Sequence, residues 1–198
     1  MRYEEIGKDL FITNREKFKA KLKPNSVAIV CSNDVMPSNA DGTMPFRQNS
    51  NLLYLSGIDQ EESVLIIAPD FPDPKFREVL FVRETNEFIA VWEGHKYTVE
   101  EAQETSGVQT IMWTDKFEQT LNTILAETNN IYLYNNEHIR NGTEVETRSD
   151  RFNKWVHSKY NNFNFERIAP IIYDLRNKKE PREIELMQTA CDITNKGF

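Results

Sequence analysis

The chain has 198 residues, enough for one large domain with a substantial core, and its hydrophobic (39%) and charged (28%) fractions are ordinary for a globular protein. Its 24 basic and 31 acidic residues give a net charge of -7, and no cluster of lysine and arginine offsets that excess. The composition therefore argues against nucleic acid and anionic membranes as partners, because both require a concentrated positive field.

No apolar run approaches the ~20 residues that span a bilayer, and the first six residues lack the apolar core of a signal peptide. The two cysteines, Cys31 and Cys191, lie far apart in the sequence. We interpret both as small buried hydrophobic residues in a reducing compartment rather than as a disulfide. A cytoplasmic protein is therefore expected.

Short apolar runs alternate with amphipathic stretches along the chain, a pattern typical of an α/β domain. A first helix is expected from Thr13, where Glu16 completes a capping box, to Pro24. The apolar, β-branched run 26–31 predicts a buried strand. The polar stretch 32–50 that follows is too long for a simple connection, and loops of that length are often functional.

Strands are also expected at 63–68 and 78–83, as antiparallel partners joined by a proline-rich turn. The remaining predicted elements follow in chain order: a helix over 99–105 opened by a Thr98–Glu101 capping box, a helix starting at 114–115 whose apolar face is Phe117, Leu121, Ile124 and Leu125, a strand over 131–134, and a helix over 151–160.

The last stretch predicts a helix that begins near Pro181, since proline is tolerated in a first helical turn. Ile184, Met187, Cys191 and Thr194 form an apolar stripe along it. Nothing in the sequence after the stripe could cover it. We interpret this helix as the start of a further domain that continues beyond the given sequence.

The sequence contains no self-sufficient active site. Its three histidines, His95, His138 and His157, have no partner at a metal-binding spacing. There is no His-Glu-x-x-His or Cys-x-x-Cys pair, no phosphate-binding glycine loop, and no Gly-x-Ser-x-Gly motif. Cys31 has no local base to activate it. We therefore predict neither a catalytic residue nor a metal ligand in this chain.

Three segments in series resemble the N-terminal region of Xaa-Pro aminopeptidases and their prolidase relatives. The first, 39–58, contains an acidic residue followed by Phe-Arg-Gln-x-Ser and Tyr-Leu-x-Gly patterns. The second, 91–96, contains Trp-x-Gly and a basic residue, and the third, 175–187, contains the pattern Arg-x-x-Lys-x-x-x-Glu-Ile-x-x-Met. Leu53 and Ile58 stand where the family usually has aromatic residues, which weakens the placement in a subfamily and leaves the fold inference intact.

The resemblance implies a mixed β-sheet with helices on both faces, the creatinase N-terminal-domain type with a ribonuclease H-like motif. It divides the chain into an aminopeptidase P N-terminal domain over 1–174 and, over 175–198, the junction and first helix of a catalytic domain that is missing. In the family that domain binds two divalent metals, usually manganese, and releases the N-terminal residue of Xaa-Pro peptides. This chain alone is then expected to be inactive. A prolidase or creatinase-like parent and a non-enzymatic peptide-binding module remain alternatives.

Four residues of these segments are candidates for the substrate cleft or a subunit interface: Asp41, Arg47, Trp92 and Arg176. Arg47 is predicted to pin the long loop, through backbone carbonyls or a pair with Asp41, or else to contact substrate. Arg176 is either part of a solvated linker or a cation that reaches toward the cleft.

Trp92 has polar neighbours, so we predict that it lies at a surface edge as a contact anchor. In family oligomers the N-terminal domain mediates subunit contacts, and the resemblance implies that Trp92 and Asp41 help to wall a neighbouring subunit's cleft, with ordinary packing of Trp92 as the alternative. Tyr54, Leu55 and Gly57 are predicted to pack within the domain, with Gly57 in a turn that needs a positive φ.

Overall fold

The computed structural model describes residues 6–142 and 144–198, so all but one of the residues inspected for a signal peptide lie outside it. The described residues form a six-stranded sheet in the order β4-β3-β2-β1-β5-β6. The strands are β1 (Ser26–Cys31), β2 (Val64–Ile67), β3 (Glu78–Val82), β4 (Thr110–Trp113), β5 (Asn130–Leu133) and β6 (Asn164–Arg167). Only β2 runs against its neighbours in this set, because the pairs β1–β5, β5–β6 and β3–β4 are parallel. The expected mixed sheet is confirmed.

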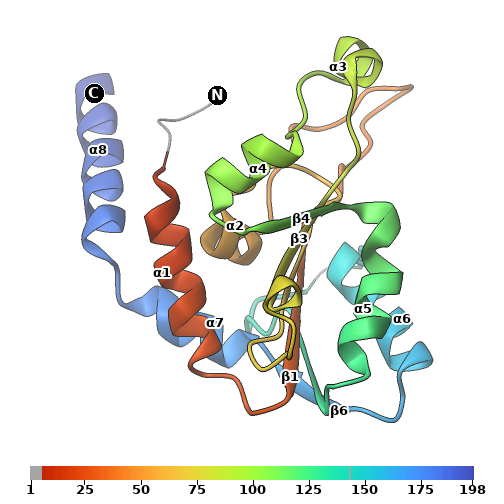
Figure 1. Ribbon diagram of the computed structural model, residues 1–198. Coiled ribbons are helices and arrows are strands. Elements are labelled where there is room, and N and C mark those ends of the chain that lie inside the picture. Colours follow the sequence, from red (N-terminus) through yellow and green to blue (C-terminus); the bar gives the residue numbers. More distant parts are fainter. Residues whose placement is uncertain (1–5, 143) are drawn as a thin grey trace.

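Helices cover both faces of this sheet, as expected (Figure 1). On one face lie α1 (Lys8–Lys19), α2 (Ser50–Ser56), α4 (Val99–Ser106) and α7 (Ala169–Asn177), and on the other α5 (Phe117–Leu125) and α6 (Arg148–Lys159). Two further helices, α3 (Glu87–Glu93) and α8 (Pro181–Gly197), belong to neither core and contain no buried residue. Short 3-10 turns occupy Pro74–Phe76 and Thr114–Lys116.

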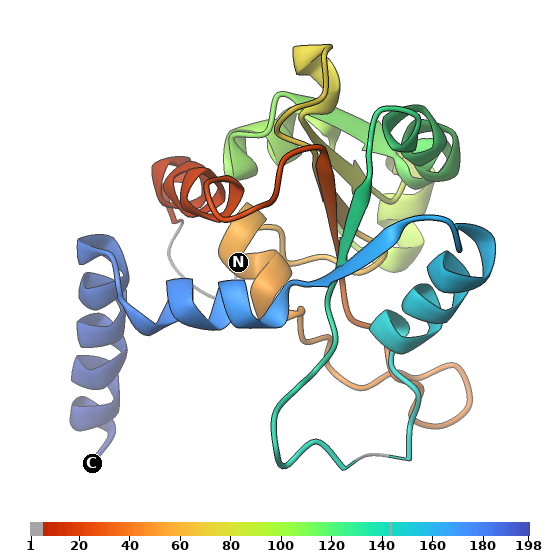
Figure 2. The same ribbon diagram turned by 90° about the horizontal axis from the view of Figure 1, so that it is seen from below.

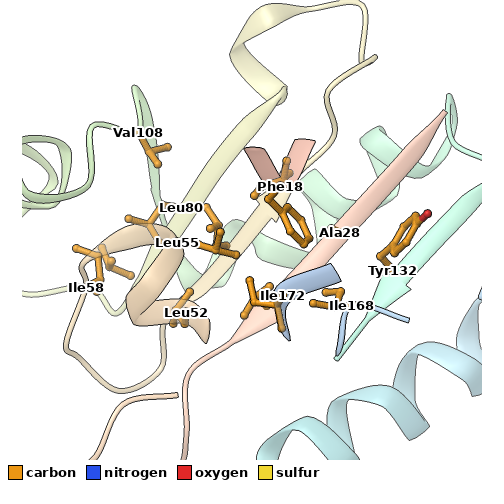
Figure 3. Close-up of a cluster of buried hydrophobic side chains, with 14 of the residues drawn as sticks. Phe18, Ala28, Leu52, Leu55, Ile58, Leu80, Val108, Tyr132, Ile168 and Ile172 are labelled. Carbon is orange, nitrogen blue, oxygen red and sulfur yellow. The ribbon is translucent and has the colours of Figure 1, made fainter. Parts of the chain in front are cut away.

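The central strand β1 is buried along its whole length, and its side chains alternate between the two cores. Ala28 and Val30 join Phe18 of α1 and Leu52 of α2 in the first core, which Figure 3 shows in close-up. Val27, Ile29 and Cys31 point to the opposite face and pack with residues of α5 and α6. A continuous apolar run is what a strand covered on both faces requires.

Helix α1 begins earlier than the sequence suggested. The predicted capping box at Thr13 is wrong, because the helix starts at Lys8 after Gly7, which provides no side-chain cap. Phe11, Asn14, Arg15 and Phe18 are all buried and recur at helical spacing, so the buried face of the helix already extends upstream of Thr13. In contrast, the capping box of Thr98 and Glu101 that opens α4 is confirmed.

Both α2 and α4 end in the same structure, a buried serine followed by a glycine in the left-handed region. Gly57 (φ 72°) terminates α2, and Gly107 (φ 71°) terminates α4. The predicted positive φ of Gly57 is thereby confirmed. A side chain at either glycine would collide with α1: a Cβ at Gly57 would lie 2.3 Å from the ring of Phe11, and one at Gly107 would lie 2.7 Å from Ile12. Helix α1 therefore rests directly on both helix ends.

Helix α8 stands apart from the body of the domain (Figures 1 and 2). Pro181 is in its first turn, as predicted, and an ion pair from Lys17 to Glu180 holds its start against α1. Ile184, Met187 and Ile193 are each more than half exposed. No helix of the described residues is long and apolar enough to cross a membrane.

Candidate functional site

The long polar loop after β1 is held to the domain by Gln48. Its Nε2 donates to the carbonyls of Ile58 (3.0 Å) and Gln60 (2.8 Å), and its Oε1 accepts from the backbone of Asn49 (2.7 Å). Asn49 in turn caps α2 by accepting from the backbone of Asn51 at 2.9 Å. These bonds fix the end of the loop and the start of the helix as one unit.

The prediction that Arg47 pins this loop is wrong. Its side chain is exposed, and among the described residues its guanidinium forms neither an ion pair with Asp41 nor a hydrogen bond to a carbonyl. The backbone carbonyl of Arg47 accepts a hydrogen bond from Asn33 Nδ2 at 3.0 Å. Asp41 is exposed at the far end of the loop, next to Ala40 with φ 49°. The residue that anchors the loop is therefore Gln48 and not its neighbour Arg47. An amide side chain both donates and accepts, so it can bind backbone groups as well as a guanidinium can.

Trp92 lies on α3, a two-turn helix that stands off the sheet (Figure 1). Asn86 caps its start by accepting from Ile89, and Arg83 reaches its end through an ion pair to Glu93 at 2.6 Å. Trp92 is 75% exposed, and Phe88 and Val91 beside it are exposed to the same degree. We call Phe88, Val91 and Trp92 the α3 patch. The predicted surface position of Trp92 is confirmed by this exposure.

Arg176 is half-buried and connects α7 to α2 through side-chain hydrogen bonds, so it is not part of a solvated linker. Its Nη1 donates to Asn51 Oδ1 (2.7 Å) and Ser50 Oγ (3.1 Å), and its guanidinium lies 6.0 Å from the centre of the Tyr54 ring. Burial raises the pKa of Tyr54 to about 12, and the nearby Glu183 and Glu180 add to the shift. The carboxylates of α8 thus act electrostatically on the end of the domain where Arg176 is placed.

The candidate residues therefore do not converge on one catalytic centre. Arg176 contacts the start of α2, three residues after Arg47, while Trp92 belongs to a separate projection on α3. Within residues 6–142 and 144–198, no group of three His, Cys, Asp or Glu side chains could hold a metal ion. These described residues therefore do not fit a metal centre.

The two cysteines are free, in agreement with the interpretation from the sequence. Cys31 is buried, and burial raises the pKa of its thiol to about 12 despite the opposing charge of Arg148. A thiol with such a pKa is not a nucleophile at neutral pH. Cys191 is exposed on α8, so its interpretation as a buried hydrophobic residue is wrong for this chain.

Comparison with known proteins places this geometry in one family. The family model of the aminopeptidase P N-terminal domain matches residues 11–134. The chain is 26% identical over 193 residues to a Xaa-Pro aminopeptidase of Haemophilus influenzae, which covers 98% of this chain and 42% of that protein. It is 27% identical over 177 residues to Xaa-Pro aminopeptidase 3 of Homo sapiens, covering 88% of this chain and 34% of that protein. The chain thus spans about two fifths or less of these relatives.

Solved structures give the same correspondence. A protein assigned as aminopeptidase P from Bacillus anthracis superposes with a TM-score of 0.81 at 27% identity, covering 91% of this chain and 42% of that one. The low-pH form of aminopeptidase P from Escherichia coli superposes with a TM-score of 0.77 at 23% identity, covering 96% and 43%. The second likeness shows the fold alone. The expected mixed sheet flanked by helices is therefore also the architecture of this region in those proteins.

Proposed function

Because this chain belongs to the aminopeptidase P N-terminal domain family, we propose that it is the non-catalytic N-terminal domain of a Xaa-Pro aminopeptidase. The observation that carries the proposal is the match of the family model over 11–134 in a chain that spans only 42% of a Xaa-Pro aminopeptidase. The described residues also lack a metal-binding cluster. Bond cleavage would then belong to a separate catalytic domain, and this chain alone would be inactive.

The parent enzyme would be a cytoplasmic metallopeptidase that releases the N-terminal residue from peptides whose second residue is proline. The bond before proline has no N–H on its nitrogen, so it needs a dedicated enzyme. Two divalent metals, manganese in this proposal, would reside in the catalytic domain. A prolidase or creatinase-like parent is the alternative within the same superfamily, and a peptide-binding module without activity is the alternative outside it.

The proposed division of the chain is 1–174 for the N-terminal domain and 175–198 for the junction and first helix of the catalytic domain. Helix α7 crosses the boundary between 174 and 175 and packs on the first core through Ile172, with Leu175 at its edge. The break in helical structure falls at Lys178–Glu180, before α8. The apolar side of α8 would be covered by the rest of the catalytic domain.

We further propose that the α3 patch contacts another subunit of a homo-oligomer and, with Asp41, borders the peptide cleft of that subunit. The exposure of Trp92, Phe88 and Val91 supports this role, because large aromatic side chains are the usual anchors of protein contacts. Arg176 would act in the cleft indirectly, by fixing the start of α2. Arg47, whose guanidinium is exposed at the same end of the domain, would be able to contact substrate.

Two experiments test the proposal. The first is the coding sequence after Phe198, which should encode a domain with two Asp, one His and two Glu metal ligands; a stop codon would refute the proposal. In the second, the purified 198-residue chain should not cleave a Xaa-Pro peptide in the presence of manganese, and measurable turnover would contradict the non-catalytic assignment.

The role of the α3 patch needs the full-length enzyme. Trp92→Ala should change KM or kcat for peptides and weaken the oligomer in analytical ultracentrifugation. Ile139→Ala is the matched control, because Ile139 is 96% exposed but lies on a different loop. Unchanged kinetics and assembly for Trp92→Ala would remove the α3 patch from the proposal.

A further inference from the structure

A groove of about 570 Å³ lies beside the carboxyl end of β1, and its lining includes neither Arg176 nor a residue of the α3 patch. The loop after β1, the turn before β2, and the starts of α5 and α6 contribute its lining, through Asp34, Glu62, Phe117 and Arg148 among others. Its size falls within the range of small-molecule sites, and the carboxyl ends of parallel strands are the usual position of ligands on open α/β sheets. Neither the family assignment nor the proposed function uses this groove.

The wall of the groove is aromatic and held in place. Phe117, Phe152 and Trp155 contact one another, with ring centroids 5.6–6.4 Å apart. Phe117 is anchored from beneath by an edge-on contact with the buried ring of Phe81 at 5.3 Å. All three rings are only partly buried, so they present apolar surface to the groove. Because these rings are already ordered, an apolar side chain can bind to them with little loss of conformational entropy in the protein.

Two charges on the rim, Arg148 and Glu62, have no ionic partner closer than 3.9 Å in the part of the chain that the structure describes. Arg151 is neutralised by Asp34 at 2.7 Å. Arg148, by contrast, donates one Nη1–H to Ser32 Oγ at 2.7 Å and has no carboxylate within 4.0 Å among the described residues. Glu62 is more than half exposed, and the ionic neighbour that the described residues give it, Arg83 at 3.9 Å, is bound more closely by Glu93 at 2.6 Å. The rim therefore offers one cation and one anion that remain available to a ligand.

The backbone at Glu62 adds a separate indication. Glu62 has φ 53°, in the left-handed region that a residue with a Cβ seldom adopts. Such conformations cluster at binding sites, where the surrounding structure keeps a residue in an unfavourable position. The turn is fixed by its neighbours, since Ser63 Oγ donates to the Gln60 carbonyl at 3.0 Å and its backbone to Ser32 Oγ at 3.2 Å.

We infer that this groove binds a short apolar peptide in its zwitterionic form, with the C-terminal carboxylate on Arg148, the N-terminal ammonium toward Glu62, and an apolar side chain against Phe152 and Trp155. A zwitterion of this kind complements all three features at once. A simple anion would be repelled by Glu62, and a simple cation by Arg148. Because the inference depends only on the groove, it stands or falls apart from the proposed peptidase assignment.

The probe is the dipeptide Ala-Phe, titrated into the chain while the indole N–H signal of Trp155 is followed by two-dimensional NMR. Trp92 and Trp113, which do not line the groove, serve as internal references. Ala-Phe should shift the Trp155 signal saturably at low millimolar concentration, on the order of 1 mM. Ala-Phe amide and N-acetyl-Ala-Phe, which each lack one charge, should bind at least about fivefold more weakly.

Two variants assign the charges. Arg148→Gln should abolish the preference for the free carboxylate while the preference for the free amine is kept, and Glu62→Gln should do the reverse. Arg140→Gln and Glu144→Gln, exposed positions that do not line the groove, should change neither preference. The absence of a saturable Trp155 shift up to about 20 mM would overturn the inference. So would an Arg148→Gln protein, shown by circular dichroism to be folded, that still prefers Ala-Phe over its amide.

Discussion

Arg15 should be the most sensitive polar residue of this fold. It is 1% exposed and lies at the junction of four elements. From α1, its Nη1 donates to the carbonyls of Leu55 in α2 (2.8 Å) and Ser106 in α4 (2.9 Å), while its Nε contacts Glu78 of β3 at 2.9 Å. Both carbonyls lie in the last turn of their helices, where the backbone offers no partner. One buried cation thus caps two helix ends, each of which carries a partial negative charge.

The cost of Arg15→Met follows from these contacts. The substitution leaves two buried carbonyls without a donor, at ~1–3 kcal/mol each. Glu78 keeps an ion pair with Lys19 at 2.9 Å, so its charge is not stranded. The methionine side chain refills part of the space and recovers some of the loss. We therefore expect a decrease of about 2–5 kcal/mol in the free energy of unfolding, which is the cost of the two unsatisfied carbonyls less the packing that methionine recovers.

Urea unfolding followed by tryptophan fluorescence measures this loss, with an unchanged m value as the sign that only stability changed. Arg77→Met is the matched control. Arg77 also donates to a backbone carbonyl, that of Phe71 at 2.9 Å, but its side chain is exposed. The control should lose no more than about 1 kcal/mol. A loss below about 1 kcal/mol for Arg15→Met would refute the reasoning, because it would mean that the buried contacts are worth no more than exposed ones.

Three further predictions concern Gly57 and Cys31. Gly57→Ala should lower the free energy of unfolding by more than about 2 kcal/mol, because strain at φ 72° adds to a collision with Phe11. A loss of only about 1 kcal/mol, the cost of the left-handed backbone alone, would contradict the steric account. A thiol reagent at pH 8 should label one cysteine in the folded chain and two in urea, since Cys31 is buried; two labels in the folded chain would contradict this. Folding should hold the Cys31 proton up to a pKa of about 12, above its ordinary value of 9.0. Stability should therefore be unaffected by this group below pH 9 and fall between pH 9 and 12 by at most about 1.4 kcal/mol per pH unit, a slope that Cys31→Ala should reduce.

The central strands β1, β2, β3 and β5 could be predicted because strands buried on both faces consist of apolar runs. The edge strands β4 and β6 were not, since the residues of Thr110–Trp113 are only half-buried and those of Asn164–Arg167 are half-buried or exposed. Helix α7 was not predicted for a related reason. Ala169 and Ile172 are buried, but no side-chain cap marks the start of the helix in the sequence. A strand or helix that is only partly covered leaves a weak periodic signal.

The candidate site shows the same limit at the level of single residues. The exposure of Trp92 could be read from its polar neighbours, which are local. The roles of Arg15 and Gln48 could not, because they depend on partners brought together by the fold: Glu78 lies 63 residues from Arg15, and the two carbonyls that Gln48 binds lie 10 and 12 residues away across α2. Contacts between residues so far apart in the sequence are determined by the topology of the fold and leave no local sequence pattern.

The polar anchors also explain how this domain can hold exposed apolar groups in fixed positions. The C-terminal end of α3 is tied to the domain: Arg83 pairs with Glu93, the last residue of the helix, Lys96 forms an ion pair with Glu61, and Gln60 accepts from the backbone of Tyr97 at 2.7 Å. These bonds act on the base of α3 and leave the α3 patch itself untouched. An apolar surface that is exposed but positioned loses little conformational entropy on contact. The proposed role of the α3 patch therefore depends as much on Arg83 and Lys96 as on Trp92.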